Sequence, residues 1–225
     1  MKRRKTALFW IILAAALAFA GFAGWILLSN MFLKNSPEFT SSVLHYAFVN
    51  KEKGVAYFVR IDTTKRMVYI VTLKQHYFDP VNSRALDLSN PLDVFSFVER
   101  MFDISSSQRF FASLTDKQLK EFMNSFFKNG SNDFPVFLTN LASKKAGIFD
   151  NMLLGRRLNV LRPESNFTKA SLAKFVYELR RNALRFYTLT TVIDKPVRIY
   201  VDGRQYERIY LDPKSIELIR EDLRR

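Results

Sequence analysis

The sequence has no cysteine and only two histidines, His45 and His76, among its 225 residues. Without cysteine there is no disulfide, no thiol nucleophile and no cysteine-based metal site. Two histidines exclude a histidine-rich metal site. A Ser–His–acid triad would have to use one of them, and no Gly-x-Ser-x-Gly turn is present. The chain also lacks a P-loop, a GxGxxG and an HExxH motif, so no enzyme class with a short, specific signature is indicated.

Acidic residues are few compared with basic ones: 21 Asp and Glu against 35 Lys and Arg, for a net charge of +14. Such a surface suits anionic partners, which include lipid headgroups, lipid pyrophosphates and acidic cell-wall polymers. Nucleic acid is the usual partner of a chain this basic. The sequence shows no nucleic-acid-binding motif, and the N-terminal segment described next argues against nucleic acid, so we expect none.

The N-terminus predicts a membrane anchor. Four cations, from Lys2 to Lys5, precede the uncharged apolar run of 22 residues from Ala7 to Leu28. At about 1.5 Å per helical residue the run spans a hydrocarbon layer of roughly 30 Å. Because few cations follow it, the N-terminus should be cytoplasmic and the rest of the chain outside the cell membrane.

Two alternatives compete with this single-pass anchor. A cleaved signal peptide is one, since Ala18-Phe19-Ala20 resembles a small-x-small cleavage site, but the apolar run continues past the usual length. A buried core helix is the other, and it would need a polar face that the run lacks. The predicted organisation is a cytoplasmic stub (1–6), a transmembrane anchor (7–33), a tether (34–43) and one extracytoplasmic domain (44–225).

The remainder predicts an α/β fold with a mixed central sheet and helices on both faces. Hairpins are expected from two pairs of runs rich in β-branched and aromatic residues, Val55–Ile61 with Met67–Leu73 and Val197–Val201 with Gln205–Leu211. Helices are expected to start at Asn90-Pro91, at the capping box Thr115–Gln118, at Pro135, at Asn166 and at Asp212-Pro213. The helix that starts at Thr115 should end at Gly130, and the helix that starts at Pro135 should end at Lys145. The longest helix, which starts at Asn166, should end at Phe186.

Four basic residues are candidates for binding phosphate or another anion: Arg60, Lys74, Arg162 and Lys169. They come from predicted strands, from a strand exit, and from the segment around the start of the longest helix. Loops at the carboxyl ends of strands build the binding crevice of an α/β sheet, and a helix N-terminus attracts phosphate. The competing interpretation is a basic surface whose cations are merely solvated.

At this point the chain resembles the LytR–CpsA–Psr (LCP) family, whose members transfer lipid-linked glycopolymers to the bacterial cell wall. The stretch VAYFVRIDTTKRMVYIVTL resembles the family's first core hairpin, RPESNFTKASLAKFV its arginine-rich segment, and IYVDGRQYERIYLDPKSIELIREDL its closing hairpin and helix. The resemblance covers most of residues 44–225 and implies an LCP-like domain facing the cell envelope.

The sequence departs from the family at three motifs. Glu52-Lys53-Gly54 replaces Arg-x-Asp, Lys74-Gln75-His76 replaces Pro-Arg-Asp, and Asn166–Lys169 replaces Asp-x-Gly-Arg. These changes remove carboxylates that would hold a divalent metal and arginines that would grip pyrophosphate. The resemblance therefore implies a degenerate member, without a metal or other cofactor, that binds a polyprenyl-linked or acidic cell-wall polymer with catalysis lost or weak.

Two other functions stay open. The protein could be an active phosphotransferase whose site has moved, with Mg²⁺ held by replacement carboxylates from Asp79, Asp87 and Glu164. It could instead be an envelope scaffold without a small ligand, whose basic face docks on acidic polymer, on membrane lipid or on other envelope proteins.

Overall fold

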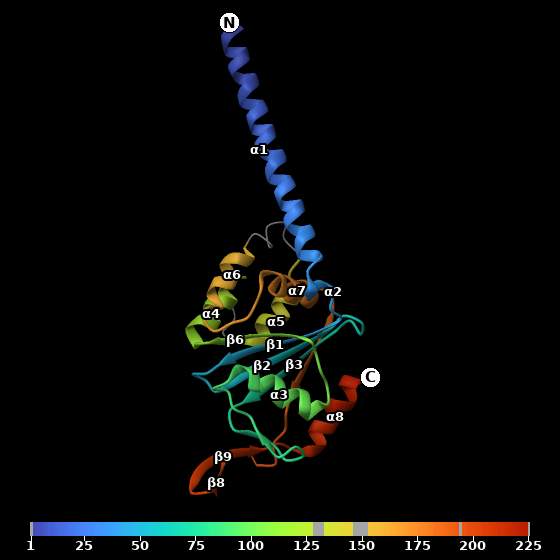
Figure 1. The fold of residues 1–225 in the computed structure, drawn as a ribbon, viewed down its shortest axis with the longest axis vertical. Coiled ribbons are helices and arrows are strands. Elements are labelled where there is room, and N and C mark those ends of the chain that lie inside the picture. Colours follow the sequence, from blue (N-terminus) through green and yellow to red (C-terminus); the bar gives the residue numbers. More distant parts are fainter. Residues whose placement is uncertain (1, 128–132, 146–152, 194, 225) are drawn as a thin grey trace.

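The computed structural model describes residues 2–127, 133–145, 153–193 and 195–224 (Figure 1). Its centre is a five-stranded sheet in the order β6-β1-β2-β3-β7. The strands are β1 (Val43–Asn50), β2 (Val55–Asp62), β3 (Met67–Lys74), β6 (Gln108–Leu114) and β7 (Ala183–Thr188). Strand β2 is antiparallel to both of its neighbours, whereas β1 with β6 and β3 with β7 are parallel. The sheet is therefore mixed, as predicted.

Helices cover both faces of this sheet, which confirms the predicted fold class (Figure 1). On one face lie α4 (Asp116–Asn124), α5 (Phe134–Ser143), α6 (Leu154–Val160) and α7 (Lys169–Leu179). On the other lie α3 (Pro91–Phe102) and α8 (Pro213–Arg224). A second sheet, in the order β5-β4-β9-β8, lies beyond α3 and α8 and contains β4 (Tyr77–Asp79), β5 (Arg84–Ala85), β8 (Val197–Val201) and β9 (Arg204–Tyr210).

The apolar runs of the central strands have side chains buried on both faces. In β1, Tyr46 and Phe48 belong to the core beneath α4–α7, and Ala47 and Val49 to the core beneath α3 and α8. This alternation follows from the two-residue period of a strand. Burying a large apolar side chain such as Phe48 stabilises the fold by about 1.5–3 kcal/mol.

Aromatic rings fill the layer between the sheet and α4–α7. The ring of Phe48 lies 4.8 Å from that of Phe134, 5.3 Å from Phe167 and 5.4 Å from Phe175, measured between centroids. These distances are typical of aromatic pairs in close contact. The high phenylalanine content of the chain thus supplies its core, and a ligand entering this layer would have to displace packed rings.

Both predicted hairpins form, and so do the predicted helix starts at Asn90 and Thr115. Asn90 accepts a hydrogen bond from the backbone of Leu92, and Thr115 with Gln118 makes the expected capping box. These local signals were reliable because each depends on side chains within a few residues of one another.

The predicted ends of two helices were wrong. Helix α7 ends at Leu179, because residues 183–188 form strand β7 beside β3 instead of continuing to Phe186. A basic, partly apolar segment suits either state, and pairing with β3 decides between them. Helix α4 ends at Asn124, before Gly130, which lies outside the described residues.

The N-terminal segment forms α1 (Lys2–Lys34), of which Ile12–Lys34 is long and apolar enough to cross a membrane. Part of the predicted tether is folded: Pro37–Thr40 form α2, and its Glu38 accepts a hydrogen bond from Thr168 Oγ1 at 2.6 Å. This hydrogen bond attaches α2 to the start of α7, close to the base of α1 (Figure 1).

Candidate functional site

Four strands of the central sheet end at the same edge. Strands β6, β1, β3 and β7 run in one direction, and β2 runs in the other. The last residues of the four parallel strands therefore lie along one side of the sheet, together with the first residue of β2. We call this side the carboxyl edge; the four strands end there at Leu114, Asn50, Lys74 and Thr188. In open α/β sheets such an edge is where ligands bind.

A cluster of charged residues lies at the carboxyl edge, where β1 and β6 end. Asp116 lies 2.7 Å from Lys53 Nζ and 2.9 Å from Lys120 Nζ, and it accepts a hydrogen bond from Asn50. The hydrogen bonds from Lys53 and Lys120 lower the pKa of Asp116 to about 2. The carboxylate is therefore ionised at neutral pH, with both of its oxygens next to ammonium groups.

A cleft of about 500 Å³ opens beside this cluster, between the start of α3 and the segment before α7. Its lining includes Leu92, Phe111 and the ion pair of Lys51 with Glu164, whose Nζ and Oε2 are 2.7 Å apart. The hydrogen bond from Lys51 holds the pKa of Glu164 below its usual value. Both partners are well exposed, so the pair contributes little to stability and either partner is accessible to a ligand.

A second cleft, of about 470 Å³, lies at the β3–β7 part of the same edge. It is lined by Lys74, Tyr77, Ile209 and the segment Thr188–Thr191. One ammonium group and several hydroxyl groups face a shared space here, which suits a singly charged anion or a sugar hydroxyl. Burial raises the pKa of Tyr77, so its phenol stays a neutral donor.

The structure places two of the four candidate cations at the carboxyl edge. Lys74 ends β3, and the carbonyl of Arg162 accepts a hydrogen bond from Gln118 in the first turn of α4. Lys169 begins α7, next to Thr168, which binds Glu38 at the opposite end of the sheet. Between Arg162 and Lys169 the chain runs along β6, so these two residues do not share a site.

The fourth candidate, Arg60, is buried in the sheet as part of a polar cluster that sequence reasoning missed. Its guanidinium lies 3.4 Å from His45 Nε2 and 3.3 Å from Asp62, and His45 Nδ1 lies 2.8 Å from Glu99 of α3. Arg109 binds the same Glu99 through two nitrogens, at 2.9 and 2.6 Å. We call these five residues the buried polar cluster; four of them are buried, and Arg109 is about half exposed at its rim.

The partners of His45 define its protonation. Glu99 accepts from Nδ1, so Nε2 is left to accept from Arg60, which is the arrangement of a neutral ring. Burial lowers the pKa of His45, and the neighbouring guanidinium of Arg60 opposes a second ring proton. The alternation of VLHYAFVN, which puts His45 on the same strand face as Ala47 and Val49, was the signal that could have predicted its burial.

The carboxylates near the carboxyl edge already have bonding partners. Among the residues that the structure describes, no three His, Asp or Glu side chains gather in one place. Asp116 and Glu164 are each already bonded to lysine ammonium groups, which a cation would have to displace. The carboxylate of Asp79 is directed to its own turn, where its oxygens accept hydrogen bonds from the side chain of Asn82 and the backbone N–H of Val81.

Comparisons with known proteins show the fold. No protein-family model matches the sequence, and no curated protein matches it. Solved structures do match: Lmo1026 of Listeria monocytogenes (10% identity, 84% of this chain and 97% of that one, TM-score 0.52) and yvhJ of Bacillus subtilis (8%, 81% and 94%, 0.53). A third is ywtF of Bacillus subtilis (8%, 85% and 92%, 0.51).

YwtF, also called TagT, is a LytR-CPS2A-psr family protein. The chain has the LytR–CpsA–Psr fold. Two segments that we expect from the sequence to stand in place of family motifs meet at the carboxyl edge: Glu52–Gly54 forms the turn before β2, and Lys74–His76 follows β3. The backbone of Gln75 donates to the carbonyl of Gly54 at 2.8 Å, so these segments are in contact. At 8–10% identity, the likeness establishes the LCP architecture and leaves ligand and activity to be proposed.

Proposed function

We propose that the protein is a membrane-anchored, LCP-like protein of the bacterial cell envelope. It binds a polyprenyl-phosphate-linked or anionic glycopolymer at its carboxyl edge, with transferase activity lost or weak. Helix α1 anchors it in the cell membrane as a single pass, with the N-terminus in the cytoplasm and residues 44–225 outside. No cofactor takes part.

The observation that carries this proposal is the composition of the carboxyl edge within the LCP fold. Two clefts of about 500 and 470 Å³ open there, and each has a lysine in its lining, Lys51 or Lys74. Arg162 is exposed at the same edge. An LCP-fold protein, YwtF, has been solved with octaprenyl pyrophosphate lipid, which identifies the class of ligand to test.

Weak or absent catalysis follows from the carboxylates. Phosphoryl transfer with Mg²⁺ needs oxygens that are free to bind the metal. Here Asp116 lies between two lysines and Glu164 is paired with a third. We therefore expect the purified protein to cleave little or no lipid pyrophosphate in the presence of Mg²⁺, and sustained Mg²⁺-dependent turnover would instead establish the active-transferase function.

Ligand binding is tested with the full-length protein in lipid nanodiscs and octaprenyl pyrophosphate as the probe. Lys74→Ala and Arg162→Ala should each weaken binding, because each removes an exposed cation at the carboxyl edge. Lys169→Ala and Arg204→Ala remove equivalent charges elsewhere and should leave the affinity unchanged. Equal affinities in all four variants would refute a ligand site at this edge.

Membrane topology is tested separately. Protease added to intact cells should digest residues 44–225, and a cytoplasmic reporter fused to the N-terminus should stay active. Protection of the domain from protease would refute the envelope assignment without affecting the fold. If the domain lies outside but binds neither lipid pyrophosphate nor an acidic wall polymer, the scaffold function is the one that remains.

A further inference from the structure

The two edge strands of the central sheet differ in how they are covered. Strand β6 is closed by the extended segment Glu164–Asn166: Ser113 donates to the carbonyl of Glu164 at 2.8 Å, and Asn166 to that of Phe111 at 3.1 Å. The side chain of Asn166 also binds the backbone of Arg109 and of Phe111. In the part of the chain that the structure describes, this segment therefore occupies the outer edge of β6 from Arg109 to Ser113.

Strand β7 at the opposite edge is open. Within the part of the chain that the structure describes, its only strand partner is β3. Ala183 donates its N–H to the carbonyl of Arg66, which ends the turn before β3, so its backbone faces the sheet. By the alternation of a strand, Leu184, Phe186 and Thr188 then direct their N–H and C=O groups outward. Such a row of backbone groups is a template for a further strand.

We propose that β7 pairs with β7 of a second copy of this chain, antiparallel about a twofold axis at Phe186, to form one continuous ten-stranded sheet. In this register Phe186 lies opposite Phe186 of the partner subunit, and Leu184 lies opposite the partner's Thr188. Each of the three outward-facing residues then stands in a hydrogen-bonded pair: its N–H donates to the C=O of the residue opposite, and its C=O accepts from that residue's N–H. If the two strands were shifted relative to each other, at least one of these three residues in each copy would be left without a hydrogen-bonding partner on β7 of the other copy.

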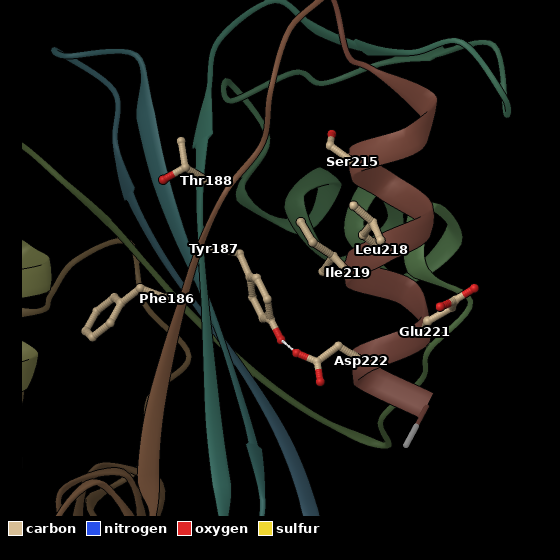
Figure 2. A pocket seen from close by; sticks show the side chains of 8 residues that line it. All are labelled: Phe186, Tyr187, Thr188, Ser215, Leu218, Ile219, Glu221 and Asp222. Atoms are coloured by element: carbon tan, nitrogen blue, oxygen red, sulfur yellow. Dashed lines mark hydrogen bonds between the residues drawn. The ribbon is translucent and has the colours of Figure 1, made fainter.

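The side chains beside this axis complement one another. Figure 2 shows Phe186 and Tyr187 on opposite sides of β7, with Tyr187 directed to α8, where its hydroxyl binds Asp222. Phe186 is 43% exposed, and Leu218 of α8 is 69% exposed in the same cleft of about 440 Å³. Pairing places the exposed Phe186 rings side by side as a cross-strand aromatic pair.

Charges also match across the axis. Arg185 binds Asp222 of its own α8 and is about half exposed. In the proposed register Arg185 lies opposite the partner's Tyr187, whose hydroxyl holds the partner's Asp222. Each Arg185 therefore lies near Asp222 of its own chain and near the partner's Asp222. The two positive charges of the arginines and the two negative charges of the aspartates balance at the axis.

The anchor is compatible with this pairing. Helix α1 leaves the molecule on the α2–α7 side of the sheet, and α3 and α8 lie on the other side (Figure 1). A twofold axis perpendicular to the sheet keeps each face on its own side, so both α1 helices emerge from the same side. Two copies joined in this way can be anchored in one membrane, which rests on the anchoring proposed above. The contacts along β7 do not depend on it.

The absence of native cysteine allows a direct test. Phe186→Cys in the full-length protein puts two thiols opposite each other on strands whose Cα atoms are about 5.5 Å apart, within disulfide range. Mild oxidation of the purified protein in detergent should shift it from 26.3 kDa to twice that mass on non-reducing gels. Tyr200→Cys, on the exposed hairpin strand β8, is the control for random collisions, and on the same gels it should run as the uncross-linked single chain.

A second variant tests the contact without a disulfide cross-link. Phe186→Lys places like charges on the axis and should halve the mass measured by light scattering, whereas Tyr200→Lys should leave the dimer intact. Circular dichroism checks that both variants are folded. A monomeric wild-type protein, or cross-linking of Tyr200→Cys equal to that of Phe186→Cys, would overturn the proposal. Capture of another protein's extended segment by monomeric β7 would overturn it too, since the edge would then serve a different partner.

Discussion

Removing Glu99 should destabilise the fold more than removing any exposed carboxylate. Glu99 is 9% exposed and accepts hydrogen bonds from His45 and from Nε and Nη2 of Arg109. In Glu99→Ala, the buried ring of His45 loses its acceptor, and Arg109 loses its ion-pair partner. Breaking a buried ion pair costs about 3–5 kcal/mol.

The side chain of Arg109 is about half exposed, so it recovers water as a partner and reduces this cost. The unpaired buried donor on His45 still costs about 1–3 kcal/mol. Because Arg109 is solvated, we expect Glu99→Ala to lower the free energy of unfolding by about 2–3 kcal/mol, at or just below the lower limit of the range for fully buried pairs. For a domain of this size the melting temperature should fall by roughly 5–10 °C.

The measurement is thermal unfolding of the full-length protein followed by circular dichroism. Tryptophan fluorescence is unsuitable because both tryptophans, Trp10 and Trp25, lie in α1. Glu217→Ala is the matched control: it removes a half-exposed glutamate that binds Arg220 on α8, and it should cost less than about 1 kcal/mol. If the two variants melt at the same temperature, Glu99 does not stabilise the fold through the buried polar cluster.

Three further predictions concern other groups. Because burial lowers the pKa of His45 in the folded state, the unfolded chain takes up its proton first as the pH falls below 6.5, and stability should decline there; His45→Gln should flatten this decline in denaturant titrations at successive pH values. Thr115→Ala should cost about 1 kcal/mol by removing the capping box of α4, measured by urea unfolding, and a cost near zero would contradict that assignment. In the double variant Lys53→Ala/Lys120→Ala the pKa of Asp116 should rise from about 2 toward its usual value, as followed by NMR titration, while an unchanged pKa would show that the two lysines are not its cause.

The fold was predictable where the signals are local. The Asp202-Gly203 turn, the capping box at Thr115 and the alternating runs that form β2 and β3 each involve residues close together in the chain. Strand β7 was missed because residues 183–188 read equally well as the end of a helix, and only pairing with β3 decides their state.

The candidate site was only partly predictable for the same reason. Lys74 could be placed at the carboxyl edge, since it follows a recognisable strand. The separation of Lys169 from Arg162 could not be foreseen, because it depends on the intervening segment running along β6. Lys53 and Lys51, which pair with Asp116 and Glu164, come from the turn after β1, more than 60 positions earlier in the chain.

The sequence by itself determined the apolar N-terminal helix, the absence of thiol chemistry, the basic charge and most of the individual strands and helices, since each follows from composition or from a short-range pattern. Only the tertiary structure decided which charges meet: it buried Arg60 and His45 under α3, paired the carboxylates of the carboxyl edge with lysines, and closed β6 while leaving β7 open. These outcomes depend on which strands lie side by side, and residues far apart in the chain are brought together only when the whole sheet assembles.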